Sequence, residues 1–268
     1  MSNPQTYLAF ATDLAHQAGE MMRAGQATML VEEKSDGTPV TAIDLAINDL
    51  VIQKVKKAFP EHGIAGEEAS HNHTADWLWV CDPIDGTVAF IAHLPVSAFS
   101  LALVHNGEPV VAVIYNPWTD TLYSAVQDQG AWRNGIPMRV STRGQDPTAI
   151  PKPIITAKGY DAYKGLFATP RAQELLQIHK WHIVHCLGIA YKGCLVAEGA
   201  LDGAVYTYTG AHDIAALQLI VTEAGGRVTD VDGKSQRYDQ PINGAIISNG
   251  VIHDKLQGIV AELQKSKF

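Results

Sequence analysis

Residues 77–87 read WLWVCDPIDGT, an apolar run that is followed by two aspartates and a tight turn. The run 77–81 is apolar enough to form a buried strand, so its end delivers Asp82 and Asp85 to a fixed place at a sheet edge. Two close carboxylates repel each other and shift each other's pKa unless a cation lies between them. A hard divalent cation with oxygen ligands removes this conflict. The stretch therefore indicates a metal site at the end of a buried strand.

Gly86 and Thr87 close this turn and add a second kind of chemistry. Their backbone N–H groups are suited to bind an anion such as phosphate. A purely structural turn stays open as an alternative, because Asp-Pro and Asp-Gly are common turn dipeptides and a threonine hydroxyl often bonds within its own turn. A cation site next to an anion site suits a phosphorylated ligand.

Four motifs along the chain resemble those of the inositol monophosphatase family. The first is Asp82-Pro-Ile-Asp-Gly-Thr87 with Phe90, which resembles D-P-[IL]-D-G-T-x-[NE]-F except that Ala89 replaces the usual Asn or Glu. The others are Lys34-Ser-Asp-Gly-Thr-Pro-Val-Thr-Ala-Ile-Asp44, Gly66-Glu67-Glu68, and His212-Asp213-Ile-Ala-Ala216 with Glu223-Ala-Gly-Gly226, where His212 replaces a tryptophan. The motifs occur in the family's order, and the resemblance covers nearly the whole chain, from about residue 5 to 265. The resemblance implies a Mg2+-dependent, lithium-sensitive phosphomonoesterase.

The first half of the chain has the pattern of helices followed by an antiparallel meander. Helical spacing of apolar residues predicts helices over 4–25 and 43–58. The polar segment 32–40, which contains Asp36, is expected to be a mobile loop. Strands are predicted at 77–81, 98–105, 109–115 and 121–126. Asn106-Gly107 indicates a hairpin turn between two of these strands, and residues 130–135 have the pattern of another hairpin.

The second half alternates strands and helices after a polar segment at 141–153 that includes Pro147. Strands are predicted at 154–157, 182–186, 202–206, 227–230 and 244–248, and helices at 170–179, 188–199, 213–225 and 251–264. We therefore expect an N-terminal α+β domain at 1–145 and a C-terminal α/β domain at 146–268. The resemblance implies that they stack as a layered α-β-α-β-α sandwich of the inositol monophosphatase and fructose-1,6-bisphosphatase type.

Composition limits the classes of partner. The chain has 268 residues, of which 46% are hydrophobic and 18% charged, with a net charge of -8. Without a basic stripe, nucleic acid is not an expected partner, and no apolar run approaches the roughly 18 residues that span a membrane. No signal-peptide pattern is present, and Cys81, Cys186 and Cys194 fit reduced core residues. We expect a cytoplasmic homodimer that acts on a small phosphorylated metabolite.

The resemblance implies a set of metal ligands. Two or three Mg2+ ions per site would be bound by Glu67, Asp82, Asp85, Asp213 and the backbone carbonyl of Ile84, with Asp82 bridging two of them. On spacing alone, Asp213 has an alternative role, because an aspartate near the start of a helix stabilises its first turn. Two such ions neutralise phosphoryl oxygens and activate a water molecule.

The resemblance also implies catalytic residues. Asp44 and Thr87 would hold and activate the water, and Glu67 is counted with them because it would hold the ion beside that water. Asp44 has a structural alternative too, since it lies in the first turn of a predicted helix, where an aspartate is favourable.

Substrate contacts are implied for residues around the ligand set. Gly86 and Thr87 would bind the phosphate, and the 32–40 segment would bring Lys34 to the site, although most lysines in such loops are only solvated. His212 would hydrogen-bond the leaving group or pack where the family has a tryptophan. Glu68 is interpreted as a surface residue.

The leaving alcohol is the open part of the prediction. Inositol 1-phosphate within a broad specificity is the first choice, although relatives that prefer it have a glutamate seven residues before the aspartate of the second motif, where this chain has Tyr206. Residues 188–199 instead resemble the 3'(2'),5'-bisphosphate nucleotidase branch, in which Lys192 would favour a second phosphate if it faces the pocket and is otherwise a helix-surface residue. Histidinol-phosphate phosphatase is a further alternative. A regulatory or interaction protein that retains the fold is the alternative class.

Overall fold

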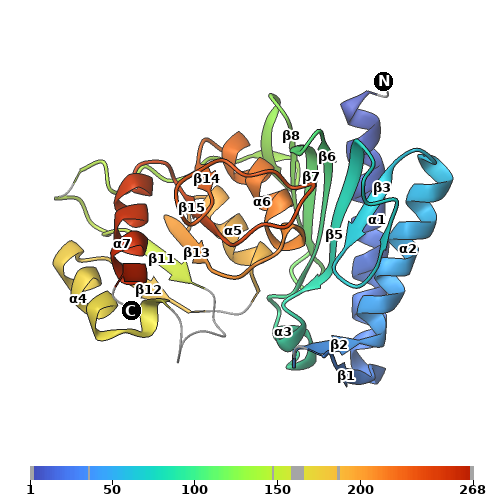
Figure 1. Cartoon of the computed structure of the whole chain (residues 1–268), viewed down its shortest axis with the longest axis horizontal. Helices are drawn as coiled ribbons and strands as arrows, with labels where there is room; N and C mark the ends of the chain where they lie inside the picture. Colours follow the sequence, from blue (N-terminus) through green and yellow to red (C-terminus); the bar gives the residue numbers. More distant parts are fainter. Residues whose placement is uncertain (1–2, 36, 147, 158–165, 186–187, 266–268) are drawn as a thin grey trace.

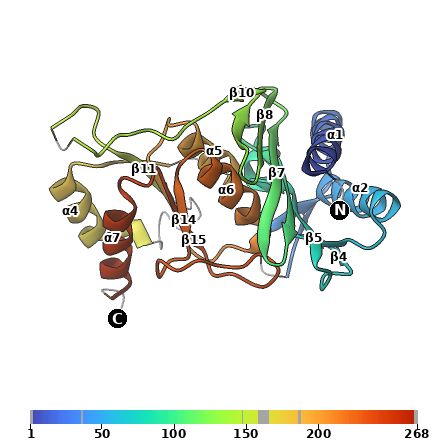
Figure 2. The ribbon, with the colours of Figure 1, turned by 90° about the horizontal axis from the view of Figure 1, so that it is seen from above.

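The computed structural model describes residues 3–35, 37–146, 148–157, 166–185 and 188–265. Asp36, Pro147 and Cys186 lie outside these ranges. The described chain is built in alternating layers: a helix pair, an eight-stranded sheet, a second helix pair, a five-stranded sheet and a third helix pair. Figure 1 shows these layers from right to left, and Figure 2 shows from above that the outer helix pairs lie at opposite ends. The expected α-β-α-β-α sandwich is confirmed.

The first layer consists of α1 (Pro4–Gly25) and α2 (Ala42–Ala58). α1 begins with Pro4 in the first turn, where a missing N–H breaks no helical hydrogen bond. α2 begins at a capping box, in which the side chains of Thr41 and Asp44 each accept from the other residue's backbone N–H. The apolar faces of both helices pack on one face of the large sheet.

The large sheet contains eight strands. They are β3 (Gly63–Gly66), β4 (Ser70–His71), β5 (Trp77–Asp85), β6 (Ala98–His105), β7 (Glu108–Asn116), β8 (Thr121–Val126), β9 (Gly130–Arg133) and β10 (Ile136–Pro137). Their order is β10-β9-β8-β7-β6-β5-β3-β4, and all neighbours are antiparallel except β3 and β5. Helices cover both faces, which explains why β5, β6 and β7 are buried along nearly their whole length.

An irregularity in β5 sets the direction of its two aspartates. In a regular strand, side chains three residues apart point to opposite faces, so the sheet would separate Asp82 from Asp85. In β5 the pairing with β6 shifts between them, so that Asp82 lies opposite Ser100 and Asp85 lies opposite Ala98. Three steps along β5 thus match two along β6, as in a β-bulge, and Pro83, which has no N–H for the ladder, lies inside it. The bulge lets both carboxylates reach one place.

The remaining layers lie beyond the other face of the large sheet. α5 (Ala190–Ala197) and α6 (Ala211–Glu223) pack between the two sheets. The small sheet contains β11 (Ile154–Ala157), β12 (His182–Val184), β13 (Gly203–Tyr206), β14 (Arg227–Thr229) and β15 (Ala245–Ser248). Its order is β12-β11-β13-β15-β14, with β11 parallel to both neighbours and β15 antiparallel to both. α4 (Pro170–His179) and α7 (His253–Lys265) cover its outer face.

The segment 32–40 is not the structureless loop that its polarity predicts. Its ends pair as an antiparallel hairpin of β1 (Val31–Glu33) and β2 (Pro39–Thr41), which leads directly into α2. The pairing satisfies backbone N–H and C=O groups that a loop would leave to water. The apolar pattern of the sequence does not predict the short elements β3 and α3 (Thr87–Ile91), because segments of four or five residues contain too few repeats of a strand or helix pattern.

The sequence also predicts the state of the cysteines, the absence of membrane spans and the position of a domain boundary. Cys81 and Cys194 are buried and free, as the sequence predicts. No helix within the described residues is long and apolar enough to cross a membrane. The large sheet is built from residues 63–137 and the small sheet from residues 154–248; the domain boundary at 145 and 146 stays a prediction.

Candidate active site

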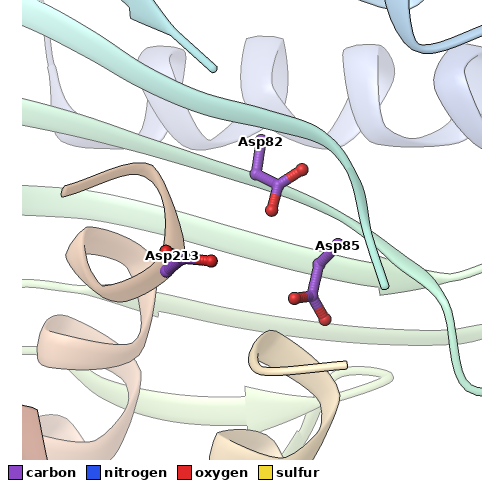
Figure 3. A group of neighbouring side chains, drawn as sticks. All are labelled: Asp82, Asp85 and Asp213. Carbon is purple, nitrogen blue, oxygen red and sulfur yellow. The ribbon is translucent and has the colours of Figure 1, made fainter. Parts of the chain in front are cut away.

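Three aspartates from two layers of the fold meet at one place (Figure 3). Asp82 and Asp85 lie at the end of β5, and Asp213 lies in the first turn of α6. One carboxylate oxygen of each residue lies within 4.8 Å of the others. Asp82 and Asp85 are buried, and Asp213 is half-buried. The structure thus brings together carboxylates that two distant sequence motifs supply.

Backbone N–H groups fix the two carboxylates of β5. Oδ1 of Asp82 accepts a hydrogen bond from the N–H of Ile84 at 3.0 Å, within the same turn. Both oxygens of Asp85 accept from the N–H of Ile189, at 2.7 and 2.8 Å, and Oδ2 also accepts from the N–H of Ala190 at 2.9 Å. Because α5 begins here, Asp85 lies at a helix N-terminus, where free N–H groups and the helix dipole favour a negative charge.

Asp213 caps its helix and faces the cluster at the same time. Its Oδ2 accepts from the N–H of Gly210 at 2.8 Å, at the start of α6. The capping role is therefore present, and it does not exclude a place in the cluster. Nε2 of His212 lies 3.5 Å from the same Oδ2. The His212 ring lies over Gly210, because a Cβ there would be 2.6 Å from Cε1 of the ring, and a substrate contact for His212 stays a prediction.

The aspartate cluster is electrostatically unfavourable. Burial raises the pKa of Asp82 well above its usual value, and the charges of Glu67, Asp85 and Asp213 raise it further. Burial also raises the pKa of Asp85 to about 7, although its hydrogen bonds from the start of α5 act in the opposite direction. In the part of the chain that the structure describes, neither Asp82 nor Asp85 forms a salt bridge with lysine or arginine. Oxygen donors with excess negative charge fit a hard divalent cation such as Mg2+.

A second acidic pair lies in the turn between β3 and β4. Nζ of Lys34 lies 2.7 Å from Oε1 of Glu67 and 2.6 Å from Oε1 of Glu68. Partial burial acts to lower the pKa of Lys34, but hydrogen bonds to the two carboxylates raise it above its usual value. The hairpin thus brings Lys34 to Glu67. Glu68 is not the surface residue that the sequence predicts, since its side chain is 8% exposed and shares this ion pair.

Asp44 lies buried at the start of α2. Its Oδ2 accepts from the backbone N–H of Thr41 at 2.8 Å and from the Thr41 hydroxyl at 2.6 Å. Its Oδ1 is buried without a hydrogen-bond partner among the described residues. Burial, opposed by the Thr41 hydrogen bonds and assisted by the charges of Glu67 and Glu68, raises the pKa of Asp44 to about 6. A free acceptor oxygen with a pKa near neutral is suited to take up a proton.

Gly86 and Thr87 lead from Asp85 into α3. Gly86 has a φ of 83°, which glycine adopts without strain, and a Cβ there would be 3.2 Å from the Cα of Gly188. Oγ1 of Thr87 donates to the backbone carbonyl of Ile84 at 3.3 Å. The Thr87 hydroxyl therefore forms a hydrogen bond within its own turn. The carbonyl oxygen of Ile84 keeps a second lone pair, which can bind another ligand. The phosphate and water contacts of Gly86 and Thr87 stay predictions.

Two residues that the sequence links to substrate choice are buried in the core. The Tyr206 side chain is fully buried, and its hydroxyl donates to the backbone carbonyl of Ile189 at 3.2 Å. Lys192 is 1% exposed, and its Nζ donates to the carbonyl of Ala157 at 2.9 Å. The same Nζ lies 5.4 Å from the centre of the Tyr206 ring. The helix-surface position predicted for Lys192 is therefore wrong.

Motif reasoning misses the part of the site that is made of backbone. The N–H groups of Ile189 and Ala190 hold Asp85 across a separation of 104 and 105 residues, so no local pattern links them. A weak signal exists at Gly188, because a glycine before an apolar helix marks a helix start, whose first N–H groups are free for an anionic partner.

Comparisons with known proteins agree with the motifs. The model of the inositol monophosphatase family matches residues 3–267. An inositol monophosphatase of Mesembryanthemum crystallinum is 33% identical over 259 residues, which cover 92% of this chain and 93% of that protein. A histidinol-phosphatase of Mycobacterium tuberculosis is 32% identical over 265 residues, with coverage of 96% and 97%. The solved structure of a Thermotoga maritima IMPase has a TM-score of 0.84 at 29% identity, with coverage of 97% and 99%. The chain therefore belongs to the inositol monophosphatase family and, with it, to the phosphoric monoester hydrolases.

Proposed function

We propose that the aspartate cluster binds Mg2+ and that the enzyme hydrolyses small phosphate monoesters, with inositol 1-phosphate as one substrate within a broad specificity. The observation that carries the proposal is the meeting of Asp82, Asp85 and Asp213 within 4.8 Å. The raised pKa values of Asp82 and Asp85 support it, because close carboxylates need a cation to stay ionised together. The family depends on Mg2+ in general.

The proposed ligand set extends the cluster to two or three ions. Glu67 and the backbone carbonyl of Ile84 would join Asp82, Asp85 and Asp213. Asp82 would be the central ligand of this set, because the charges of Glu67, Asp85 and Asp213 all raise the pKa of its carboxyl. When bound, Mg2+ neutralises phosphoryl oxygens and lowers the pKa of water.

The chain's own residues have three proposed roles in the reaction. Oδ1 of Asp44, the buried oxygen without a partner among the described residues, would accept the proton of the attacking water. The Thr87 hydroxyl would orient that water from the turn after Asp85. Lys34, which the hairpin holds beside Glu67, would contact the phosphoryl group. These roles come from the resemblance, and the geometry of Asp44 and Lys34 supports them.

Broad specificity is proposed because the position of the family's polyol-binding glutamate carries a buried residue. Tyr206 brings no carboxylate, and its hydroxyl is directed into the core. A hydrogen bond to a charged group contributes about 1.5–3 kcal/mol. Without it, inositol 1-phosphate should not be preferred by a large factor over other small phosphomonoesters.

Histidinol phosphate is a second candidate substrate. Tyr208, which is 75% exposed, lies between β13 and the start of α6 that carries Asp213. An exposed phenol ring that lies five residues before Asp213 in the chain suits an alcohol that carries a flat ring such as imidazole. Tyr208→Ala should then raise KM for histidinol phosphate more than KM for inositol 1-phosphate, and equal effects would remove this candidate.

A bisphosphate nucleotidase and a purely regulatory protein receive less support. The buried amine of Lys192 does not favour a second phosphate, which weakens the nucleotidase assignment. An intact acidic cluster argues against a regulatory protein without catalysis.

The family resemblance also predicts lithium sensitivity, a homodimer and a cytoplasmic location. Lithium sensitivity follows from the proposed ligands and is tested by inhibition under saturating substrate. The homodimer and the cytoplasmic location stay predictions, and light scattering after size-exclusion chromatography tests the first.

A panel of phosphomonoesters tests the function directly. Phosphate release is measured from inositol 1-phosphate, histidinol phosphate, fructose 1,6-bisphosphate and adenosine 3',5'-bisphosphate, with Mg2+ and with chelator. We expect Mg2+-dependent release from several of them. A preference above about a hundredfold for inositol 1-phosphate over every other compound would contradict the missing charged contact, which accounts for about ten- to a hundredfold.

A further inference from the structure

Helix α2 carries a second buried polar side chain one turn after Asp44. Asn48 lies four residues later, so the two side chains lie on the same face of the helix. Asn48 is 2% exposed. Asparagine is a weak helix former, and a buried amide is costly unless it is hydrogen-bonded. Its position inside α2 therefore needs a specific explanation.

Asn48 contacts the turn that carries the two glutamates of the site. Its Nδ2 donates to the backbone carbonyl of Ala69 at 3.1 Å. Its Oδ1 lies against Gly66, where a Cβ would be 2.1 Å from this oxygen and 2.4 Å from the carbonyl oxygen of Ala69. Gly66 has no room for a side chain because the amide of Asn48 reaches between the two ends of the turn.

The same turn is fixed to the large sheet on its other side. The N–H of Glu67 donates to the backbone carbonyl of Cys81 at 3.0 Å, directly before Asp82. The turn is thus tied to β5 through its backbone and to α2 through Asn48. The ion pairs of Lys34 with Glu67 and Glu68 hold the side chains of the turn, whereas Asn48 holds its backbone, so a substitution of Asn48 removes a separate contact.

The contact contributes little to stability. Ala69 is exposed, so its carbonyl can bond water if Asn48 is lost. Oδ1 of Asn48 is buried without a hydrogen-bond partner among the described residues, and such a group destabilises a fold. Asn48 lowers stability and yet holds one turn in place. Its presence in α2 is therefore better explained by the placement of this turn than by a contribution to core packing.

We infer that Asn48 is a positioning residue, which holds the Gly66–Ala69 turn against α2 and thereby keeps Glu67 in place beside the aspartate cluster. The inference rests on the proposed function, because Glu67 is a Mg2+ ligand only under that proposal. Loss of the Asn48 contact should weaken Mg2+ binding through Glu67. It should leave the reaction step at saturating Mg2+ nearly intact, because the Asp44 cap and the Asp85 contacts do not involve Asn48.

The test compares Asn48→Leu, which keeps the branched shape but removes the donor, with the wild-type chain. Gln53→Ala is the matched control, since it removes an exposed amide from the same helix. Mg2+ affinity is measured by calorimetry without substrate, and kcat and the Mg2+ concentration at half-maximal rate are measured with inositol 1-phosphate. We expect Asn48→Leu to weaken Mg2+ binding about 3- to 10-fold, the range of a single hydrogen bond. We also expect kcat at saturating Mg2+ to change less than twofold and the thermal midpoint not to fall.

Different outcomes separate this inference from the proposed function. Wild-type Mg2+ affinity in a folded Asn48→Leu chain would overturn it, and so would a lower kcat with unchanged affinity. If Asn48→Leu does not fold, Asn48 is a structural residue and the inference is wrong, provided that the smaller Asn48→Ala also fails. If the wild-type chain neither binds Mg2+ nor releases phosphate, the proposed function fails instead.

Discussion

Two buried aspartates of this chain have opposite surroundings. Asp202 is 0% exposed, and its two oxygens accept from Nε of Arg143 at 2.9 and 2.8 Å. The same carboxylate accepts from the N–H of Ile154 at 2.7 Å and from the hydroxyl of Ser141. Asp82, which is 3% exposed, accepts from one backbone N–H and faces other carboxylates.

The difference separates a carboxylate that is satisfied within the chain from one that is not. Around Asp202, the chain supplies the cation and the hydrogen-bond donors, so the buried charge is satisfied on folding. Around Asp82, the chain gathers like charges, and burial raises the pKa of Asp82 well above its usual value. The first arrangement is complete within the chain, while the second favours a cation from solution. Substitutions at Asp202 should therefore affect stability, whereas substitutions around Asp82 should affect catalysis and the response to Mg2+.

The largest expected effect is on stability at Asp202. Asp202→Ala removes the carboxylate partner of Arg143 and leaves it only the backbone carbonyls of Gly199 and Ala200, and breaking a buried pair by removing one member costs about 3–5 kcal/mol. We expect the free energy of unfolding, measured by urea denaturation, to fall by that amount. The Mg2+ dependence of the folded fraction should not change. A loss below about 1 kcal/mol would mean that this pair resembles an exposed ion pair, which contributes little.

The next effect is on catalysis at Asp44. Asp44→Asn keeps the shape of the residue but removes the charge that would accept a proton. We expect kcat to fall by ~10²-fold, within the range of general-base removal, with KM little changed. Asp49→Asn on the exposed side of the same helix is the control and should leave kcat unaltered. If Asp44→Asn keeps a nearly wild-type kcat, Asp44 is only a capping residue.

A smaller effect, with the opposite sign, is expected at Asp82. Asp82→Asn removes a buried carboxyl whose pKa burial and the neighbouring charges raise, so the chain without metal should become more stable near pH 7.5. The variant should also lose stabilisation by Mg2+. Thermal unfolding in chelator and in Mg2+ measures both. A variant less stable than the wild-type chain in chelator would show that Asp82, like Asp202, is satisfied within the chain.

The last and most gradual effect is the pH dependence of stabilisation by Mg2+. Burial raises the pKa of Asp85 from the usual 3.8 to about 7. In chelator, this group therefore contributes stability that is complete below pH 4 and is lost as the pH rises through about 7. Mg2+ needs ionised ligands, so the gain in stability on adding Mg2+ should increase between pH 5 and 8, by up to about 1.4 kcal/mol per pH unit for each group.

Histidines such as His62, His179 and His253 act in the opposite direction, because burial lowers their pKa values, and their effect must be separated from this one. Burial lowers the pKa of His253 from 6.5 to about 4. Its contribution to stability is therefore present above pH 6.5 and is lost as the pH falls toward 4. Since these histidines contribute equally with and without Mg2+, the difference between the two pH curves isolates the carboxylates. A difference that is independent of pH would contradict the raised pKa of Asp85.

Much of the fold could be predicted because long elements repeat their apolar pattern. The helix at 4–25 and the strands at 98–105 and 121–126 have the bounds that periodicity predicts. The hairpin of β1 and β2 could not be predicted, because three-residue strands in a polar segment carry no periodic signal. The order of the layers followed from resemblance, since periodicity does not say which helices cover which sheet.

The residue types of the candidate site could be predicted from the sequence, but the backbone geometry and the hydrogen bonds that hold these residues could not. Motif spacing indicates Asp82 and Asp85, yet it does not reveal the bulge that turns both carboxylates to one place. The donors to Asp85 and the burial of Lys192 depend on contacts between layers that are distant in sequence. Local sequence does not specify such contacts, so it cannot distinguish a lysine on the helix surface from the buried position that Lys192 has.

The central proposal is that the aspartate cluster acts only with a cation from solution. The sharpest measurement is the turnover of inositol 1-phosphate by one sample in chelator and after titration with Mg2+, with the thermal midpoint followed in parallel. We predict no turnover in chelator, full recovery with Mg2+, and stabilisation of about 2.7 kcal/mol at a hundred times the dissociation constant. Equal turnover in chelator and in Mg2+ would contradict this proposal.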